Sequence, residues 1–174
     1  MRSEYIPEDQ LQRIRRSLNE GDRLILDMCI ETGARIDEAL CMRRYQIKGG
    51  RVLLNEWKTN KKRVCEISED LQSRLGEKVK GKHVFSYVFD GQGRPEERAK
   101  VHRSTFWRHV KKVCKDLGLE QHTYTPHSLR KVYAVRLLRR TRSLEQVRKI
   151  MGHKYLSTTM IYALSDRADE LGLY

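Results

Sequence analysis

Apolar residues recur every three or four positions over most of the chain, which is the spacing of amphipathic helices. This spacing predicts helices in three stretches near the N-terminus, at residues 7–18, 22–32 and 36–43. Pro7 suits the first position of the first helix, and Gly33 is placed to cap the second helix at its C-terminus. A further helix is predicted to begin after the capping residue Ser68 and to continue to about Val79.

Two short segments depart from this spacing and show the alternation of polar and apolar residues that is typical of β-strands. They are residues 51–57 and 63–67, and a polar turn around Thr59 would join them into an antiparallel hairpin. A strand fragment is predicted at residues 83–89, and the glycine- and proline-containing residues 90–95 are predicted to form a loop.

Helical spacing returns in the last part of the chain. The predicted helices cover residues 104–117, 126–140, 144–151 and 157–162. Ser157 is placed to cap the last of them. The predicted fold class is therefore mainly α with a small antiparallel β-hairpin or sheet (α+β). A length of 174 residues suits one domain, residues 1–174, built around one core.

Positive charge is concentrated in one segment of the chain, and this distribution bears on the kind of partner that the protein binds. The formal net charge is +13, and residues 100–154 contain 15 basic and three acidic residues. The rest of the chain contains 21 basic and 20 acidic residues. A surface that served solubility alone would intersperse both signs. We therefore expect a polyanionic partner, most simply a nucleic acid.

Several other classes of protein are excluded by what the sequence lacks. No apolar run reaches the about 20 residues of a membrane-spanning helix, and no secretory signal follows Met1, so a cytoplasmic location is expected. The four cysteines form no Cys-x-x-Cys pair, so reduced thiols are expected and no zinc site. The sequence contains no carboxylate cluster with metal-ligand spacing and no phosphate-binding glycine loop, so no cofactor is expected.

Four segments combine residue types that can act on a phosphate group. They are Thr-Gly-Ala-Arg-Ile-Asp-Glu at residues 32–38, His-Ser-Leu-Arg at 127–130, Met-Gly-His at 151–153 and Thr-Thr-Met-Ile-Tyr at 158–162. Each has an ordinary interpretation when it is taken alone. Arg35 could form a local ion pair with Glu38, His153 could meet a helix C-terminus, and Tyr162 could belong to the core. Only the combination indicates a function.

Together the four segments resemble the motifs of the tyrosine recombinase, or phage integrase, family. Residues 32–38 match the family's Thr-Gly-x-Arg-x-x-Glu, and residues 127–130 match its His-x-Leu-Arg. Met151 replaces leucine in the family's Leu-Gly-His, a swap that conserves volume. Tyr162 follows His153 by nine residues, as the family's tyrosine does. The resemblance covers about the whole chain and implies the catalytic-domain fold of DNA breaking-rejoining enzymes.

The resemblance also implies a reaction, which is the cleavage and rejoining of DNA without metal or ATP. Tyr162 would form a 3′-phosphotyrosyl bond and leave a free 5′ hydroxyl. The residues that would assist it are Arg35, His127, Arg130 and His153. Their chemistry agrees with this role, because guanidinium groups match phosphate oxygens and imidazoles can bond those oxygens or move a proton.

A further catalytic residue is implied by the family alone, namely a hairpin lysine that protonates the leaving 5′ oxygen. Lys58 fits best because it ends the first strand, and Lys61 and Lys62 are the alternatives. Most members carry a separate DNA-grasping domain before the first motif. Only 31 residues precede Thr32, so the chain is expected to be a minimal catalytic domain or a fragment of a longer protein.

The expected partners are double-stranded DNA and further copies of the chain, four of which would pair two DNA sites. The tail after Tyr162 could dock on a neighbouring copy or pack on its own domain. Its apolar candidates for either contact are Leu171, Leu173 and Tyr174.

Other functions share part of this pattern. Telomere resolvases and type IB topoisomerases use the same arginines and tyrosine. A DNA-binding regulator without catalysis would not need the complete set, which is present here, and an RNA-binding domain would be expected to carry a stacking-aromatic motif.

Overall fold

The structure is a computed structural model that describes residues 3–56, 61–84, 86–91 and 100–167. Helices α1 (Glu8–Ser17), α2 (Glu20–Thr32) and α3 (Ile36–Leu40) and the 3-10 turn η1 (Arg44–Gln46) precede the sheet. The sheet is antiparallel, in the order β1 (Ile47–Lys48), β2 (Arg51–Glu56) and β3 (Lys61–Glu66). It is followed by α4 (Glu69–Val79), α5 (Arg103–Asp116), α6 (Pro126–Thr141), α7 (Leu144–Met151), α8 (Leu156–Ala163) and η2 (Ser165–Arg167). The predicted class, mainly α with a small antiparallel sheet, is confirmed.

Local sequence signals fix many of the helix ends. Asn19 begins α2 by accepting a hydrogen bond from the backbone of Asp22 at 2.9 Å. Ser68 caps α4 as predicted, through the backbone of Leu71 at 3.2 Å. Gly33 ends α2 with a φ of 63°, in the left-handed region that glycine adopts without strain.

Two predicted segments differ from the structure near the sheet. The third helix ends at Leu40 instead of residue 43, because Arg43 has extended backbone and pairs with Tyr87 in an isolated β-bridge. Residues 83–89 were predicted to be a strand fragment, and this is wrong for those described, which form turns apart from that one bridge. A single bridged residue produces no alternating pattern of polar and apolar residues, so the sequence pattern cannot reveal it.

Two predicted helix starts also differ. Pro7 is the residue before α1 and not its first helical residue. Ser157 lies inside α8 and does not cap it, because the extended backbone is at Tyr155, which supplies no side-chain cap. The cap thus lies two residues earlier than predicted.

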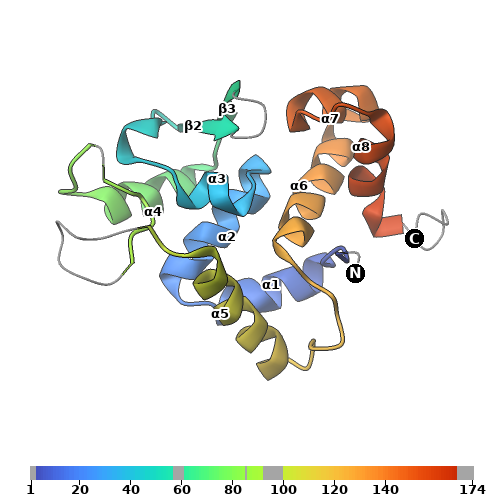
Figure 1. Cartoon of the computed structure of the whole chain (residues 1–174), viewed down its shortest axis with the longest axis horizontal. Coiled ribbons are helices and arrows are strands. Elements are labelled where there is room, and N and C mark those ends of the chain that lie inside the picture. The colour runs from blue at the N-terminus through green and yellow to red at the C-terminus, as the bar shows by residue number, and fades with distance from the viewer. Residues whose placement is uncertain (1–2, 57–60, 85, 92–99, 168–174) are drawn as a thin grey trace.

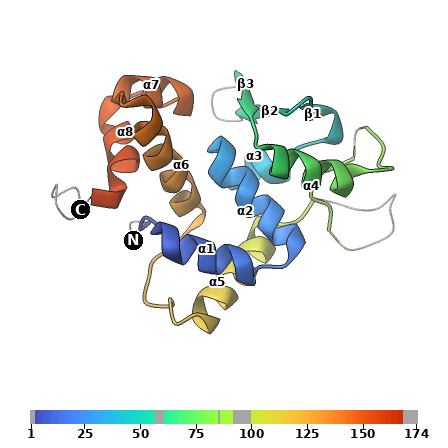
Figure 2. The same ribbon diagram turned by 180° about the vertical axis from the view of Figure 1, so that it is seen from behind.

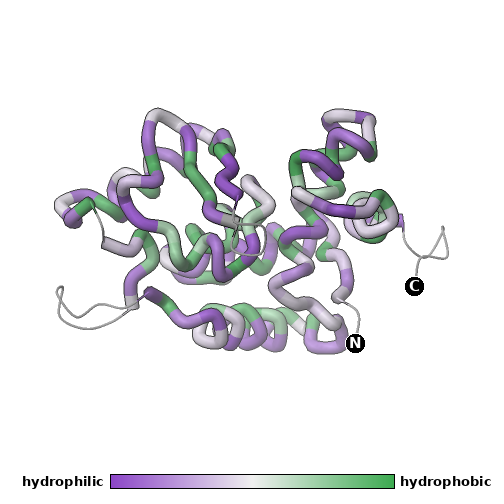
Figure 3. Tube along the Cα trace, turned by 45° about the horizontal axis from the view of Figure 1, so that its top comes forward, coloured by the Kyte–Doolittle hydropathy of each residue, from purple (hydrophilic) through white to green (hydrophobic). Residues whose placement is uncertain are grey.

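The hydrophobic core consists of two clusters that meet in α6. The larger cluster joins helices α1 to α5, β2 and the N-terminal half of α6, where Leu129 and Val132 are buried. The smaller cluster joins the C-terminal half of α6 to α7 and α8. Figures 1 and 2 show α6 between α2 on one side and α7 and α8 on the other. In Figure 3 the helices carry both hydrophilic and hydrophobic residues, as amphipathic helices around a core do. Helix α6 therefore connects the two parts of the molecule.

No helix in the described part of the chain is both long and apolar enough to cross a membrane.

A buried ion-pair network fastens α1 and α4 to α2. The Asp27 carboxylate, whose side chain is 3% exposed, accepts hydrogen bonds from Arg15 at 2.6 and 2.9 Å. It also accepts one from Arg74 at 2.8 Å, and Arg74 bonds the exposed Asp70 at 2.9 Å. The attraction between such charges offsets the free-energy cost of removing them from water, so the loss of one partner leaves the other uncompensated.

Asp27→Asn is expected to lower the free energy of unfolding by about 3–5 kcal/mol, because it leaves two arginines facing a neutral amide in a buried site. The matched control is Asp70→Asn, since Asp70 binds the same arginine from the surface and should contribute about 0–1 kcal/mol. Urea unfolding followed by circular dichroism measures both variants. Equal effects of the two substitutions would contradict the assignment.

Candidate active site

Arg35 lies where the chain passes from α2 to α3. The left-handed turn at Gly33 ends α2, and Arg35 becomes the residue before α3, with extended backbone. The carboxylate of Glu38, which is 5% exposed, accepts a hydrogen bond from the Arg35 backbone at 2.9 Å and one from its guanidinium at 2.7 Å. The local ion pair considered from the sequence is therefore present, and it orients the Arg35 guanidinium.

Arg130 lies on the first turns of α6 and is 3% exposed. One terminal nitrogen of its guanidinium donates to the carbonyl of Gly33, and the other donates to the carbonyl of Met151 at 2.6 Å. Arg130 thus connects the first sequence motif with the third. Because backbone carbonyls hold both terminal nitrogens, the plane of the guanidinium is fixed before any ligand binds.

Arg35 and Arg130 lie close enough for the charge of one to affect the other. Burial, followed by the nearby charge of Arg35, lowers the pKa of Arg130 to about 10, although Glu38 acts in the opposite direction. Both arginines line one cavity of about 540 Å³, together with His127. A site that lowers the pKa of a buried cation such as Arg130 is stabilised by an anion, and a phosphate group has the size and charge to fill that role.

Tyr162 lies on α8 and points its hydroxyl at His127. The hydroxyl oxygen is 3.1 Å from Nδ1 of that histidine. Burial raises the pKa of Tyr162, and the charges of Arg130 and Arg35 partly offset this effect. The phenol therefore carries its proton at neutral pH and would need a base in order to act as a nucleophile. His127 is placed to serve as that base.

His153 follows Gly152, which ends α7 with a φ of 65°. Its Nδ1 is 3.1 Å from the hydroxyl of Thr159, which is fully buried on α8. The rings of His153 and Tyr162 meet edge to face, with their centroids 5.3 Å apart. The third motif and the tyrosine-bearing helix are therefore locked together, and the Thr-Thr-x-x-Tyr spacing supplies the threonine that does so.

The structure brings together five of the six residues predicted for the site, namely Arg35, His127, Arg130, His153 and Tyr162. Lys58 lies outside the described residues, so its role stays a prediction. Of its alternatives, Lys61 shares a face of β3 with Arg63, which contacts the first motif, whereas Lys62 faces the same way as the exposed Val64. Strand alternation therefore favours Lys61 over Lys62.

Helix α5 contributes residues that the sequence did not assign to the site. Arg103, Ser104 and Trp107 line the same cavity as Arg35 and Arg130. Arg103 also forms an ion pair with Asp37 at 3.3 Å. The only sequence signal for these residues was their position in the basic segment. Amphipathic spacing shows which face of a helix is buried, but it does not show which other residues lie near the exposed face.

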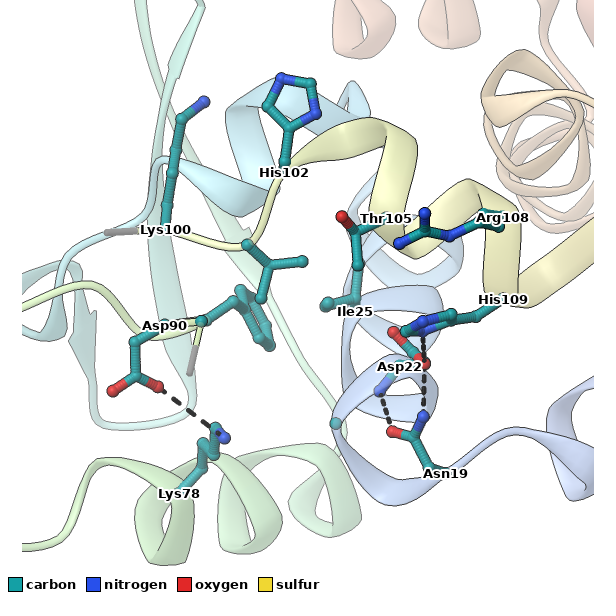
Figure 4. A pocket seen from close by; sticks show the side chains of 14 residues that line it. Asn19, Asp22, Ile25, Lys78, Asp90, Lys100, His102, Thr105, Arg108 and His109 are labelled. Atoms are coloured by element: carbon teal, nitrogen blue, oxygen red, sulfur yellow. Dashed lines mark hydrogen bonds and ion pairs between the residues drawn. The ribbon is translucent and has the colours of Figure 1, made fainter. Parts of the chain in front are cut away.

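A larger cavity, of about 730 Å³, lies elsewhere in the molecule (Figure 4). It is lined by residues of α2 and α5, by Lys78 near the end of α4, and by residues 89–91 and 100–102. Asp22 of α2 lies 2.7 Å from His109 of α5 in this cavity. None of the five predicted and described site residues lines it. In the described part of the chain, no three His, Cys, Asp or Glu side chains lie together so that they could hold a metal ion.

Comparison with known proteins supports the family that the sequence motifs indicate. The sequence model of the phage integrase family matches residues 4–168. The integrase of Escherichia phage P2 is 27% identical over 159 residues, which cover 91% of this chain and 42% of that relative. The tyrosine recombinase XerA of Pyrococcus horikoshii is 30% identical over 161 residues, which cover 90% of this chain and 55% of that relative. The chain thus spans about half the length of the curated relatives that it matches.

Solved structures show the same fold. A crystal structure of XerA recombinase superposes with a TM-score of 0.75 and 23% identity, over 96% of this chain and 63% of that one. The catalytic domain of bacteriophage HP1 integrase superposes with a TM-score of 0.61 and 21% identity, over 97% of this chain and 95% of that one. The recombinase catalytic-domain fold predicted from the motifs is confirmed. With its family match and its assembled motifs, this chain belongs to the phage integrase family.

Proposed function

We propose that this chain is the catalytic domain of a site-specific DNA recombinase, which cleaves and rejoins strands through a 3′-phosphotyrosyl bond to Tyr162. The observation that carries the proposal is the 3.1 Å approach of the Tyr162 hydroxyl to His127, within one chain. Arg35 and Arg130 line the cavity beside them. The curated relatives named tyrosine recombinases and integrases support the same activity.

In the cleavage step, the Tyr162 oxygen attacks the phosphorus of a DNA strand and its proton passes to His127. The bond from phosphorus to the 5′ oxygen breaks, and the electron pair stays on that oxygen. A hairpin lysine, for which Lys58 is the candidate, supplies the proton that completes the free 5′ hydroxyl. One phosphodiester replaces another, so a 5′ hydroxyl from a second strand can reverse the step and complete the exchange.

The arginines act on the charge that develops during this step. Arg35 and Arg130 would each donate to the non-bridging oxygens, whose negative charge grows as the tyrosine oxygen approaches. Their positions are fixed in advance by Glu38 and by the carbonyls of Gly33 and Met151. His153 completes the donors around the phosphate and is oriented by Thr159. Preorganised donors lower the barrier because no reorganisation is needed when the charge appears.

Double-stranded DNA is the proposed substrate, and four copies of the protein are proposed to assemble on two paired sites. Of the 15 basic residues between positions 100 and 154, all but Arg130 and Lys131 are at least partly exposed. The solved neighbours include XerH recombinase bound to its difH substrate and lambda integrase bound to a COC′ core site. Exposed basic residues in the segment that also supplies Arg130 suit a duplex that places one phosphate in the cavity lined by Arg35 and Arg130.

The test uses covalent capture from a pool of nicked duplexes with randomised flanking sequence. Escape of the short 5′-hydroxyl fragment next to the nick prevents rejoining, so protein that has cleaved stays attached to DNA under denaturing conditions. We expect adducts to form, and to form equally in excess EDTA, because arginines supply the charge that a metal would otherwise supply. Sequencing the attached DNA would then define the recognised site.

The outcomes of the capture experiment separate the alternatives. Adducts that need magnesium would indicate a metal-dependent nuclease, and no adduct with any duplex would indicate a regulator that binds without cleaving. Once a site is known, hairpin-ended products would identify a telomere resolvase. Plasmid relaxation without paired sites would identify a type IB topoisomerase.

A further inference from the structure

The C-terminal end of α2 is held by side chains from two other parts of the molecule. The last carbonyls of a helix have no partners within it, and the last turn of α2 contains no basic residue of its own. The carbonyl of Thr32 accepts a hydrogen bond from Arg63, and the next carbonyl, that of Gly33, accepts one from Arg130. Two arginines from distant elements thus cap the segment from which Arg35 projects.

Arg63 makes this contact from the sheet. It lies on β3, opposite the fully buried Leu54 of β2. Its terminal nitrogen Nη1 is 2.6 Å from the carbonyl oxygen of Thr32 and 3.0 Å from the Sγ atom of Cys65. The contact with Thr32 fastens the β2–β3 hairpin to the end of α2, 31 residues away in the sequence.

Helix α6 holds the same segment from the other side. The Tyr133 ring packs against Gly33 so closely that a Cβ atom there would lie 2.2 Å from ring atom Cδ1. Burial raises the pKa of Tyr133 and lowers that of Arg130, and the nearby charge of Arg63 opposes the first shift and adds to the second. Residues 32 and 33 are therefore enclosed between the hairpin and α6, and a shift of either element would move Arg35.

We infer that Arg63 is a positioning residue, which holds the β2–β3 hairpin and the Arg35–Arg130 pair in one fixed arrangement through the carbonyl of Thr32. The inference rests on the function proposed above. Arg63 does not touch the reacting phosphate in this assignment. It sets the place of whatever general acid the hairpin carries relative to the phosphate that the two arginines bind, and an error of about 1 Å in such a placement costs about 100-fold in rate.

The experiment compares Arg63→Met and Arg63→Lys with wild-type protein on two nicked duplexes of the captured sequence. One duplex has the ordinary oxygen at the scissile 5′ position, and the other has sulfur there, which leaves without needing a proton. The single-turnover cleavage rate and the DNA affinity are measured for each protein on each of the two duplexes. The matched control is Arg51→Met, because Arg51 lies on the same sheet but is 65% exposed in its pair with Glu66.

Arg63→Met is expected to slow cleavage of the oxygen duplex by about 100-fold at unchanged DNA affinity. Sulfur should recover about tenfold or more of that loss, since a misplaced acid then matters less. Arg63→Lys should restore part of the rate, because an ammonium group can still donate to the Thr32 carbonyl. Arg51→Met should match wild type on both duplexes.

Other results overturn the inference. An unchanged cleavage rate in Arg63→Met would show that Arg63 does not place the acid. An equal loss of cleavage rate on the oxygen and sulfur duplexes in the folded Arg63→Lys variant would show the same. Absence of any adduct with wild-type protein on both duplexes would refute the proposed function and the inference with it. Circular dichroism of each variant separates these results from simple unfolding.

Discussion

Tyr162→Phe is expected to abolish the covalent protein–DNA adduct while DNA affinity stays within about twofold of wild type, because ring burial and packing are kept. The phenyl ring preserves the edge contact with His153, whose centroid lies 5.3 Å away. Only the oxygen that lies 3.1 Å from His127 is removed. Without that oxygen no phosphotyrosyl bond can form, so the loss should be complete and not partial.

The assay is denaturing gel electrophoresis after incubation with the captured nicked duplex. Tyr155→Phe and Tyr133→Phe are the matched controls, and both should still form the adduct. Tyr155 is 59% exposed at the start of α8, and Tyr133 packs against Gly33 through its ring. An adduct that persists in Tyr162→Phe and disappears in either control would overturn the assignment of the nucleophile.

Arg130→Lys is expected to slow cleavage by about 100- to 1,000-fold, equivalent to about 3–4 kcal/mol in the transition state. Lysine keeps the positive charge but not the planar fork. Arg130 uses that fork to hold the carbonyls of Gly33 and Met151 while it faces the cavity. A single ammonium group cannot replace all of these contacts, so the phosphate loses an aligned donor.

The control for Arg130→Lys is Arg139→Lys, on the same helix. Arg139 forms a surface ion pair with Asp166 at 2.7 Å, and its side chain is 63% exposed. This variant should cleave at the wild-type rate. Single-turnover rates on the captured duplex and the free energy of unfolding are measured for both. Cleavage by Arg130→Lys at more than about a tenth of the wild-type rate would contradict a role for the fork.

The sequence predicted the helices because their signals are local. Helical spacing, the caps at Ser68 and Gly33 and the alternation in the hairpin each depend on residues within a few positions of one another. Two features near the sheet were not predicted because that condition does not hold for them. Strand β1 has two residues, too few to show a period, and the bridge from Arg43 to Tyr87 depends on a partner 44 positions away.

The identity of the site residues was also within reach of the sequence. Arginine, histidine and tyrosine in the family's order and spacing indicated Arg35, His127, Arg130, His153 and Tyr162, and all five are described and lie around one centre. Such motifs can be recognised because the chemistry requires particular side chains. The residues that orient them carry weaker signals. Thr159 was visible only as part of a motif, and Arg63 as one basic residue among many.

What the sequence determined by itself is therefore the set of helices, the chemical groups and the family that they indicate. Only the tertiary structure decided how those groups are held. Arg63 and Arg130 bind the backbone carbonyls of Thr32 and Gly33, 31 and 97 residues away. A carbonyl is present in every residue, so no pattern of side chains marks the two that are used. Packing of the β2–β3 hairpin and of α6 against the end of α2 selects them, and that packing is a property of the whole chain.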